Sequence, residues 1–219
     1  MKKMTRSEVD EMSDNLIITI GRQFCSGGLE IGRKVAEKLG IECYDKELIG
    51  RAAKESGLSE DIFEMADEKP SNSFLYSIVM GSYYSNSFFF PNDDVLTNDK
   101  LFGIQSKAIK ELSKEKSCVI VGRCSDYILR EEKRLLRVYL WADMDKRIER
   151  FKKVYPEKAE QVKDTEAALK KMDKKRAAYY EYYTGNVWDN VKNYDLIINT
   201  AKFGYENAVD KIVEFSKLL

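Results

Sequence analysis

A glycine-rich turn near the start of the chain combines residue types that suit phosphate binding. The turn reads GRQFCSGG over residues 21–28 and separates a short apolar run, residues 16–20, from an amphipathic segment. Free N–H groups at the start of a helix attract phosphate, and residues without bulk let the backbone approach an anion closely. The small residues here are Ser26, Gly27 and Gly28. A strand–helix connection without a ligand has the same composition, so the turn alone leaves both interpretations open.

Two arginines and one carboxylate elsewhere in the chain suit the same chemistry. Arg123 follows an apolar run, residues 118–121, so we expect it at the carboxyl edge of a sheet, where it can bind phosphate with two hydrogen bonds. Asp173 and Arg176 are three residues apart and therefore share one face of a predicted helix. The alternatives are a surface salt bridge for Arg123 and a solvated, charged helix for the other two.

The absence of histidine excludes several kinds of catalytic site. A Ser-His-Asp triad, a Cys-His pair and a histidine-ligated zinc site all need an imidazole, and the chain has none. Carboxylates, lysines, arginines, hydroxyls and backbone amides must therefore carry any chemistry. Cys25 lies inside the glycine-rich turn. A pKa lowered by the helix start would make its thiol redox-sensitive and able to block the anion site, whereas the alternative is a small residue that fills the turn.

Composition and charge indicate a globular chain without a strong electrostatic field. The 219 residues are 43% hydrophobic, which is enough to bury a core. Lys+Arg and Asp+Glu number 37 each, and this balance argues against a nucleic-acid or membrane-surface binder. The four cysteines form no CxxC pair, and no apolar run suits a signal peptide or a bilayer span. We therefore expect free thiols and a cytoplasmic location.

Short apolar runs alternate with amphipathic segments along the chain. The runs, predicted as strands, are residues 16–20, 41–44, 118–121, 136–141 and 194–199. The helices are predicted from residue 28 to a cap at Gly40, from Asp45 to about 55, over 60–68, over 98–115, after a cap at Asp143, over 165–184 before Gly185, and over 204–218. This alternation is typical of an α/β fold with a parallel sheet covered on both faces. Residues 71–99 are rich in Ser, Asn, Tyr and Phe, and we interpret them as an insertion, a lid or an interface between copies of the chain.

Several collinear segments together resemble one known family. They are IITIGRQFCSGGLEIGRKVAEKLGIECYDKELI, SCVIVGRCSDYIL, DKKRAAYYEYYTGNVW and NYDLIIN. From about residue 16 to the C-terminus the chain resembles the cytidylate-kinase-like family, which belongs to the P-loop nucleoside monophosphate kinases. The resemblance implies a three-layer P-loop NTPase-like fold with a five-stranded parallel sheet, helices on both faces and a helical lid within residues 158–185. A polar arm, residues 1–15, then precedes a single kinase-like domain over residues 16–219.

The resemblance also implies roles for individual residues. Asp45 and Arg51 match an aspartate and an arginine six residues later that contact the acceptor monophosphate, and Arg123 matches an arginine that grips phosphate. Asp173 and Arg176 match part of a lid motif, Arg-x3-Asp-x2-Arg, in which Arg176 neutralises the transferring group and Asp173 orients it. The residues implied to cradle ATP phosphates are Ser26, Gly27 and Gly28.

Three positions depart from the family pattern. Cys124 and Leu169 stand where cytidylate kinases have an aspartate and an arginine that read the base. Gly28 stands where the P-loop motif GxxxxGK[ST] has its lysine, so another cation must substitute if any does. The cations considered are Arg22, Lys34 and Lys46. We expect a protein that binds a phosphorylated small molecule without preferring CMP.

These observations predict an ATP-dependent phosphotransferase that uses Mg²⁺ and moves the γ-phosphoryl group to a nucleotide or another small acceptor. No set of protein side chains is predicted to hold a metal, and neither nucleic acid nor membrane is an expected partner. A second hypothesis is a nucleotide-binding protein that kept the fold and lost turnover. A third is a structural homo-oligomer built on residues 71–99.

Overall fold

A parallel sheet forms the centre of the fold. Its strands are β1 (Ile17–Arg22), β2 (Glu42–Tyr44), β3 (Cys118–Val121), β4 (Leu135–Trp141) and β5 (Leu196–Asn199), in the spatial order β2-β3-β1-β4-β5. In the central strand, Ile18 pairs with Val119 of β3 and with Leu136 of β4. Both faces of β1 and β3 are buried, as expected for strands of a parallel sheet. The predicted five-stranded parallel sheet is confirmed.

The chain divides into two units. The computed structural model describes residues 14–45, 48–50 and 92–219. One unit comprises Met1–Lys46 with Ile109–Leu219 and contains the whole sheet, and the other is Glu47–Ala108. In the second unit, residues 48–50 are helical, as is the first part of α5 (Asn92–Glu115). The helix predicted over residues 60–68 and the insertion over 71–91 lie outside the described residues.

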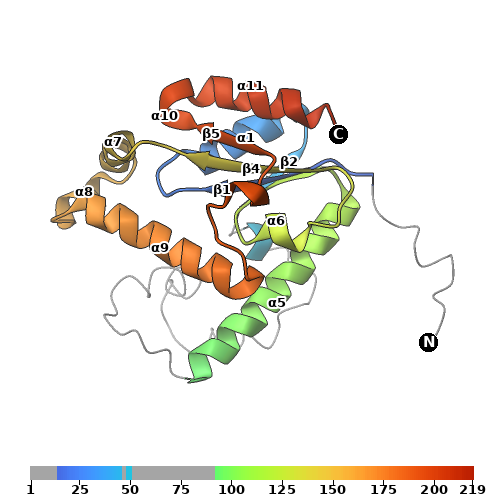
Figure 1. Cartoon of the computed structure of the whole chain (residues 1–219), viewed down its shortest axis with the longest axis horizontal. Coiled ribbons are helices and arrows are strands. Elements are labelled where there is room, and N and C mark those ends of the chain that lie inside the picture. Colours follow the sequence, from blue (N-terminus) through green and yellow to red (C-terminus); the bar gives the residue numbers. More distant parts are fainter. Residues whose placement is uncertain (1–13, 46–47, 51–91) are drawn as a thin grey trace. The chain divides into compact units, whose positions relative to one another are not determined.

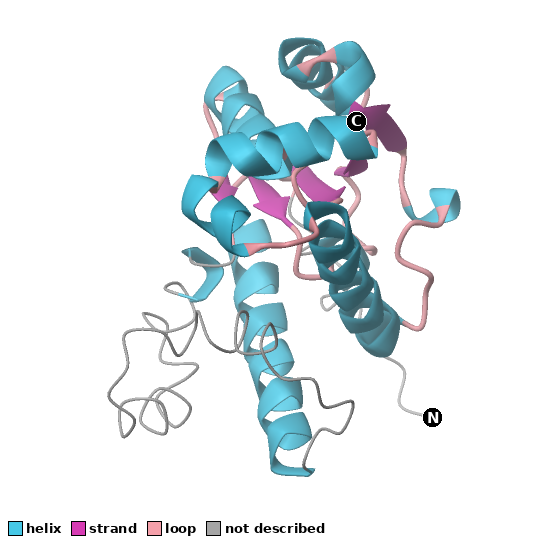
Figure 2. Cartoon of the chain, turned by 90° about the vertical axis from the view of Figure 1, so that its left-hand side faces the viewer, coloured by secondary structure: helices cyan, strands magenta, loops and turns pink. Residues whose placement is uncertain are grey.

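Helices of the first unit cover both faces of the sheet (Figures 1 and 2). They are α1 (Gly28–Leu39), α6 (Ser125–Ile128), α7 (Met144–Val154), α8 (Pro156–Gln161), α9 (Thr165–Thr184), η2 (Val191–Asn193), α10 (Thr200–Phe203) and α11 (Tyr205–Ser216). Helices α1 and α11 pack on one face, where Val35 and Ile212 join the core with Ile18 and Ile20 of β1. Helices α6 and α9 lie on the other side. The predicted layered fold is confirmed.

The predicted ends of two helices are confirmed by their caps. Gly40 after α1 and Gly185 after α9 adopt left-handed conformations, with φ of 66° and 69°, which glycine adopts without strain. Asp143 precedes α7 as predicted, but its side chain does not cap that helix. Its carboxylate instead accepts a hydrogen bond from the Asn199 side-chain amide at 3.2 Å. Asp143 therefore ties the start of α7 to the end of β5.

One helix prediction is wrong in its bounds. Helix α5 begins at Asn92, so residues 92–99 are helical although composition placed them in an irregular insertion. A helix extends beyond its strongest sequence signal because adding a residue costs less than starting a helix. The helix predicted over 204–218 is confirmed as α11, and Gly204, whose φ is 77°, separates it from the short helix α10 that precedes it.

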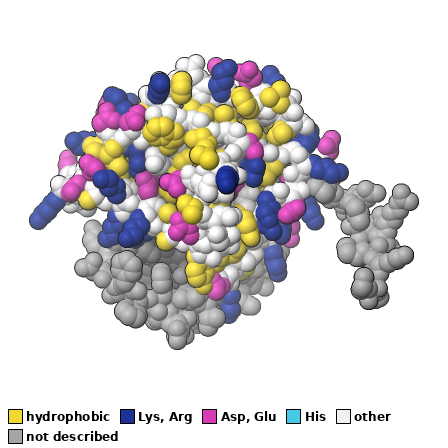
Figure 3. All heavy atoms as spheres, in the orientation of Figure 1, with side chains coloured by type: hydrophobic (Ala, Val, Ile, Leu, Met, Phe, Trp, Pro, Cys, Tyr) yellow, Lys and Arg dark blue, Asp and Glu magenta, His cyan; other side chains and the backbone are white. Residues whose placement is uncertain are grey.

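Charges of both signs are interspersed over the visible face of the described part in Figure 3. This pattern agrees with the equal numbers of acidic and basic residues. Among the described helices, none has the length and apolar character that crossing a bilayer requires.

Candidate functional site

The turn between β1 and α1 is held by buried hydrogen bonds. The Ser26 hydroxyl is fully buried and donates to the carbonyl oxygens of Gln23, at 2.9 Å, and Leu140, at 3.1 Å. The Ser26 carbonyl oxygen accepts a bond from the Thr200 hydroxyl at 2.8 Å. Ser26, which sequence suggested as a phosphate contact, therefore uses its side chain to fix the turn.

The backbone amides at the start of α1 remain as donors for an anion. The N–H of Ile31 makes the first bond of the helix, to the carbonyl oxygen of Gly27 at 3.0 Å, so the amides just before it are those that a helix start leaves unpaired. Gly27 has a φ of 85°, and an added Cβ there would lie 2.5 Å from the Tyr205 ring. Only glycine fits this position. Because it has no side chain, Tyr205 at the start of α11 packs directly against the turn.

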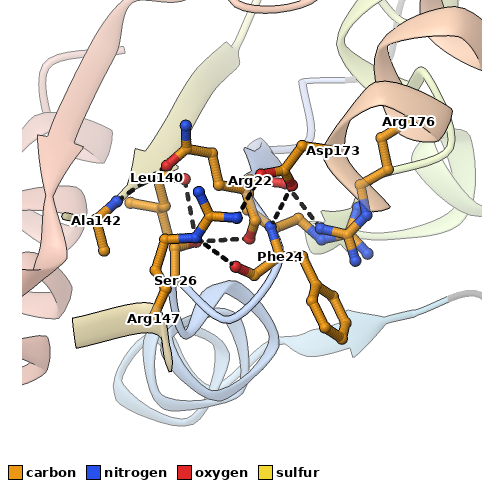
Figure 4. Close-up of polar contacts among 9 residues, drawn as sticks. Arg22, Phe24, Ser26, Leu140, Ala142, Arg147, Asp173 and Arg176 are labelled. Carbon is orange, nitrogen blue, oxygen red and sulfur yellow. Dashed lines mark hydrogen bonds and ion pairs between the residues drawn. The ribbon is translucent and has the colours of Figure 1, made fainter. Parts of the chain in front are cut away.

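Asp173 of α9 binds the turn together with Arg147 of α7 (Figure 4). The backbone N–H of Phe24 donates to Oδ1 of Asp173 at 2.7 Å. The Arg147 side chain donates through Nε to the Phe24 carbonyl oxygen at 2.8 Å and forms an ion pair with the other carboxylate oxygen of Asp173. Arg147 is only 3% exposed, so this pair is largely shielded from water. The predicted lid helix is thus joined to the turn through one carboxylate.

Arg176, one turn further along α9, reaches the same segment. Its Nη1 donates to the carbonyl oxygen of Arg22 at 2.9 Å, and its guanidinium carbon lies 5.2 Å from the centre of the Phe24 ring. Leu169, on the same stripe of the helix, is fully buried. The predicted shared face of Asp173 and Arg176 is therefore the face that α9 turns toward the phosphate-loop candidate.

Arg123 lies in an unusual turn directly after β3. Gly122, Arg123 and Cys124 have φ values of 80°, 61° and 55°, all in the left-handed region that non-glycine residues rarely adopt. The Arg123 guanidinium carbon lies 5.8 Å from the centre of the Tyr179 ring of α9. Arg123 lies at the carboxyl edge of the sheet, as its position after the strand predicted, and the structure adds that the turn directs it toward α9.

A buried hydrogen bond fixes α9 beside this turn. The Tyr180 hydroxyl donates to Oδ2 of Asp126 in α6 at 2.6 Å. Both residues are buried, and burial raises the pKa of the Asp126 carboxyl above its usual range. The C-terminal part of α9 is therefore anchored to the sheet's carboxyl edge, as its middle is through Asp173.

Arg22 brings a third guanidinium group into this region. Desolvation lowers the pKa of Arg22 well below its usual value, and the positive charges of Arg176 and Arg123 lower it further, while Asp45 acts in the opposite direction. Two of the predicted cations, Arg123 and Arg176, therefore lie close enough to Arg22 to repel it. Such an arrangement suits an anion with several negative oxygens.

The predicted acceptor pair is described only in part. Asp45 forms an ion pair with Arg33 at 3.2 Å, with its own side chain 16% exposed. Arg51 and Lys46 lie outside the described residues. Lys34, another candidate substitute for the missing lysine, forms an ion pair with Glu206 of α11.

A pocket of about 240 Å³ opens beside the turn. The residues that line it include Lys146 and Arg150 of α7, Thr200 of α10, Tyr205 of α11 and Cys25 of the turn. The guanidinium carbon of Arg150 lies 5.0 Å from the centre of the Tyr205 ring. The pocket thus combines cations and an aromatic ring next to the phosphate-loop candidate.

The thiol of Cys25 is not activated. Burial raises its pKa to about 11, and this outweighs the opposing effect of the nearby arginines Arg150, Arg147 and Arg176. Of the two alternatives that the sequence left open for Cys25, the lowered pKa is therefore excluded, because loss of solvent around the thiol is the larger effect.

We expect alkylation of Cys25 by iodoacetamide to accelerate about tenfold per pH unit from pH 7 to pH 10, because only the thiolate reacts. The rate follows from mass spectrometry of the peptide that contains Cys25, with Cys25→Ser as the control that identifies the signal. A rate that levels off below about pH 8 would show that the thiol is activated after all.

Sequence reasoning missed Arg147, Thr200 and Tyr205. Arg147 had a signal: it lies four residues before Phe151, so both share the buried face of α7. A charged residue on a buried face needs a partner, which pointed to a polar contact. Thr200 and Tyr205 had no such signal, since only the packing of α10 and α11 brings them to the turn.

Known proteins resemble the chain over nearly its whole length. The model of the cytidylate kinase-like family matches residues 17–202. Cytidylate kinase of Archaeoglobus fulgidus is 28% identical to the chain over 206 residues, which cover 92% of this chain and 96% of the relative.

Solved structures share the fold. The crystal structure of an uncharacterized protein from Eubacterium ventriosum is 26% identical, with a TM-score of 0.67 and coverage of 94% of this chain and 100% of that chain. Shikimate kinase from Acinetobacter baumannii, in complex with shikimate, is 18% identical, with a TM-score of 0.51 and coverage of 95% and 96%, and this likeness shows the fold alone. The family match includes β1 to β5, the glycine-rich turn and the arginines around it, and the chain belongs to the cytidylate kinase-like family.

Proposed function

We propose that this protein is an ATP-dependent phosphotransferase that moves the γ-phosphoryl group of ATP to a nucleotide or another small phosphorylated or hydroxylated acceptor. The observation that carries the proposal is that the guanidinium groups of Arg123 and Arg176 lie near Arg22, whose side chain passes the start of α1. Phosphoryl transfer depends mainly on positioning and on cations that neutralise the spread-out negative charge of the transition state. Family membership supports a kinase of nucleotides or small molecules.

Each part of the site takes a distinct role in this proposal. The amides at the start of α1, from Gly27 onward, bind the phosphates of ATP, and the pocket beside Cys25 receives the rest of the nucleotide. Arg123 and Asp45 hold the acceptor, and the resemblance implies the same role for Arg51. Arg176 neutralises the transferring group from α9.

The Mg²⁺ that such a reaction uses would be held here mainly by the phosphates of the nucleotide. Among the described residues, no cluster of three or more His, Cys, Asp or Glu side chains is arranged to hold an ion. Leu29 stands where the P-loop motif has its hydroxyl. Mg²⁺ commonly keeps several waters and binds substrate phosphates, so we propose that it enters with ATP, where it neutralises phosphate charge.

The test is ADP release from Mg·ATP with a panel of acceptors: CMP, dCMP, UMP, AMP, GMP, shikimate and water alone. We expect turnover that depends on one acceptor and falls about 100-fold in kcat/KM for that acceptor in Arg123→Ala. The matched control is Arg130→Ala, an exposed arginine beyond α6 whose Nε lies 3.4 Å from Glu131, and it should retain activity.

The panel also tests the altered base recognition. Cys124 and Leu169 replace the base-reading residues, so CMP should hold no large advantage over other monophosphates. A clear preference for CMP would contradict this part of the proposal. An Arg123→Ala variant with full activity would contradict the proposed acceptor site.

The second candidate function is nucleotide binding without turnover. The glycine at position 28 favours it, because the lysine of the P-loop motif normally reaches the β- and γ-phosphates. A folded protein that binds ATP and releases no ADP with any acceptor would support this function and exclude the first.

A further inference from the structure

The path of the Arg22 side chain accounts for the glycine that replaces the P-loop lysine. Arg22 is the last residue of β1, and Gly28 is the first residue of α1. A Cβ added at Gly28 would lie 2.6 Å from Cγ and 2.8 Å from Cβ of Arg22. No side chain fits at position 28 while Arg22 takes this course, so the arginine occupies the space from which a lysine at position 28 would start.

The far end of the same side chain lies against Gly122, the glycine after β3, whose φ of 80° also favours glycine. A Cβ added at Gly122 would lie 1.8 Å from Nη1 and 2.8 Å from Cζ of Arg22. Because β1 and β3 are neighbours, the Arg22 side chain runs from the end of one strand, past the start of α1, to the end of the other. Its guanidinium group therefore lies between the phosphate-loop candidate and Arg123.

The surroundings of the guanidinium group call for an anion. Within residues 14–45, 48–50 and 92–219, no ion pair joins Arg22 to a carboxylate. The charges of Arg176 and Arg123 act on it from nearby. Partly buried cations that repel one another are stabilised when a multivalent anion binds among them.

The alternative cation within the described residues is engaged elsewhere. Lys34 lies on α1 and forms its ion pair with Glu206 of α11, on the face of the sheet away from α9. Arg22, by contrast, lies both at the start of α1 and beside Gly122.

We propose that Arg22 bridges the β- and γ-phosphates of ATP from the end of β1, in place of a lysine at position 28, and that Gly28 and Gly122 provide the room for its side chain. This inference rests on the proposed function for the identity of the anion. A guanidinium group offers two parallel donors and keeps its charge, so it bridges two phosphate oxygens where an ammonium group acts as a point charge.

The test removes the cation at position 22 and introduces a lysine at position 28, where the P-loop motif has it. Arg22→Gly removes the cation, Gly28→Lys adds one against the existing arginine, and the double variant Arg22→Gly/Gly28→Lys removes the clash and restores a lysine. Affinities for ATP, AMP and inorganic tripolyphosphate are measured by calorimetry on each full-length protein, with melting temperatures to confirm folding. Arg22→Lys provides a folded, conservative comparison, and Lys34→Ala is the matched control.

We expect Arg22→Gly to lose at least tenfold in affinity for ATP and tripolyphosphate while the affinity for AMP changes little. The double variant should recover at least tenfold over Arg22→Gly, Gly28→Lys alone should not improve on the wild type, and Lys34→Ala should bind as the wild type does. Wild-type affinity in Arg22→Gly, or a double variant no better than Arg22→Gly, overturns the inference.

The two proposals fail in different ways. If the affinities follow the expected pattern and no acceptor gives turnover, the inference about Arg22 stands and the kinase function fails. If turnover occurs and Arg22→Gly leaves it intact, the function stands and the inference fails. A wild-type protein that binds neither ATP nor tripolyphosphate contradicts both.

Discussion

Replacing Arg176 by alanine is expected to lower kcat about 1,000-fold, with a much smaller change in the KM for ATP. Arg176 is held by the Arg22 carbonyl oxygen and by the Phe24 ring, so its guanidinium group is already positioned at the turn. A cation that acts on the transferring phosphoryl group stabilises the transition state more than the bound substrate, and its loss therefore appears in kcat. The measurement is steady-state ADP release with the acceptor identified by the panel.

Two comparison variants separate this role from a general loss of charge on α9. Lys170→Ala removes an exposed lysine paired with Glu166 on the same helix and should leave kcat within about twofold of the wild type. Arg176→Lys keeps the charge without the planar fork and should recover only part of the rate. If Arg176→Ala raised KM and left kcat unchanged, Arg176 would be a binding residue instead.

The sequence alone predicted the parallel sheet and the edge of the sheet at which the candidate site lies. Apolar runs without alternation predicted buried parallel strands, and parallel strands end at one edge. For this reason the turn after β1 and Arg123 after β3 had to be near one another once the sheet formed. The three-residue spacing of Asp173 and Arg176 likewise predicted a shared face, and both reach the turn.

The contacts within the site needed the packed structure. Ser26 is small and polar in a turn, which is equally consistent with a ligand contact and with the buried bonds to Gln23 and Leu140 that it makes. Composition cannot show that an arginine side chain crosses two glycine positions, since Gly122 lies 100 residues from Arg22. The thiol of Cys25 shows the same limit, because its pKa depends on the solvent that packing removes.

Replacing Arg147 by alanine is expected to destabilise the protein by about 3–5 kcal/mol, because it leaves the partly buried carboxylate of Asp173 and the Phe24 carbonyl oxygen without their partner. In a chain of this size that loss corresponds to a melting temperature lower by about 10 °C. Thermal unfolding followed by circular dichroism measures it. The matched control is Lys146→Ala, which removes the neighbouring, exposed lysine paired with Glu149 and should change the free energy of unfolding by less than about 0.5 kcal/mol.

A double variant distinguishes the ion pair from the packing of the arginine. Asp173→Asn keeps an oxygen that can accept the bond from the Phe24 N–H and removes the charge that Arg147 neutralises. If an uncompensated carboxylate causes the loss in Arg147→Ala, then Arg147→Met with Asp173→Asn should be more stable than Arg147→Ala, although two residues are changed. The two residues act independently if the double variant loses as much stability as Arg147→Met and Asp173→Asn lose in sum. In that case Asp173 would hold the turn through its bond with the Phe24 N–H, and α9 would keep its other bonds, from Arg176 to the Arg22 carbonyl oxygen and from Tyr180 to Asp126.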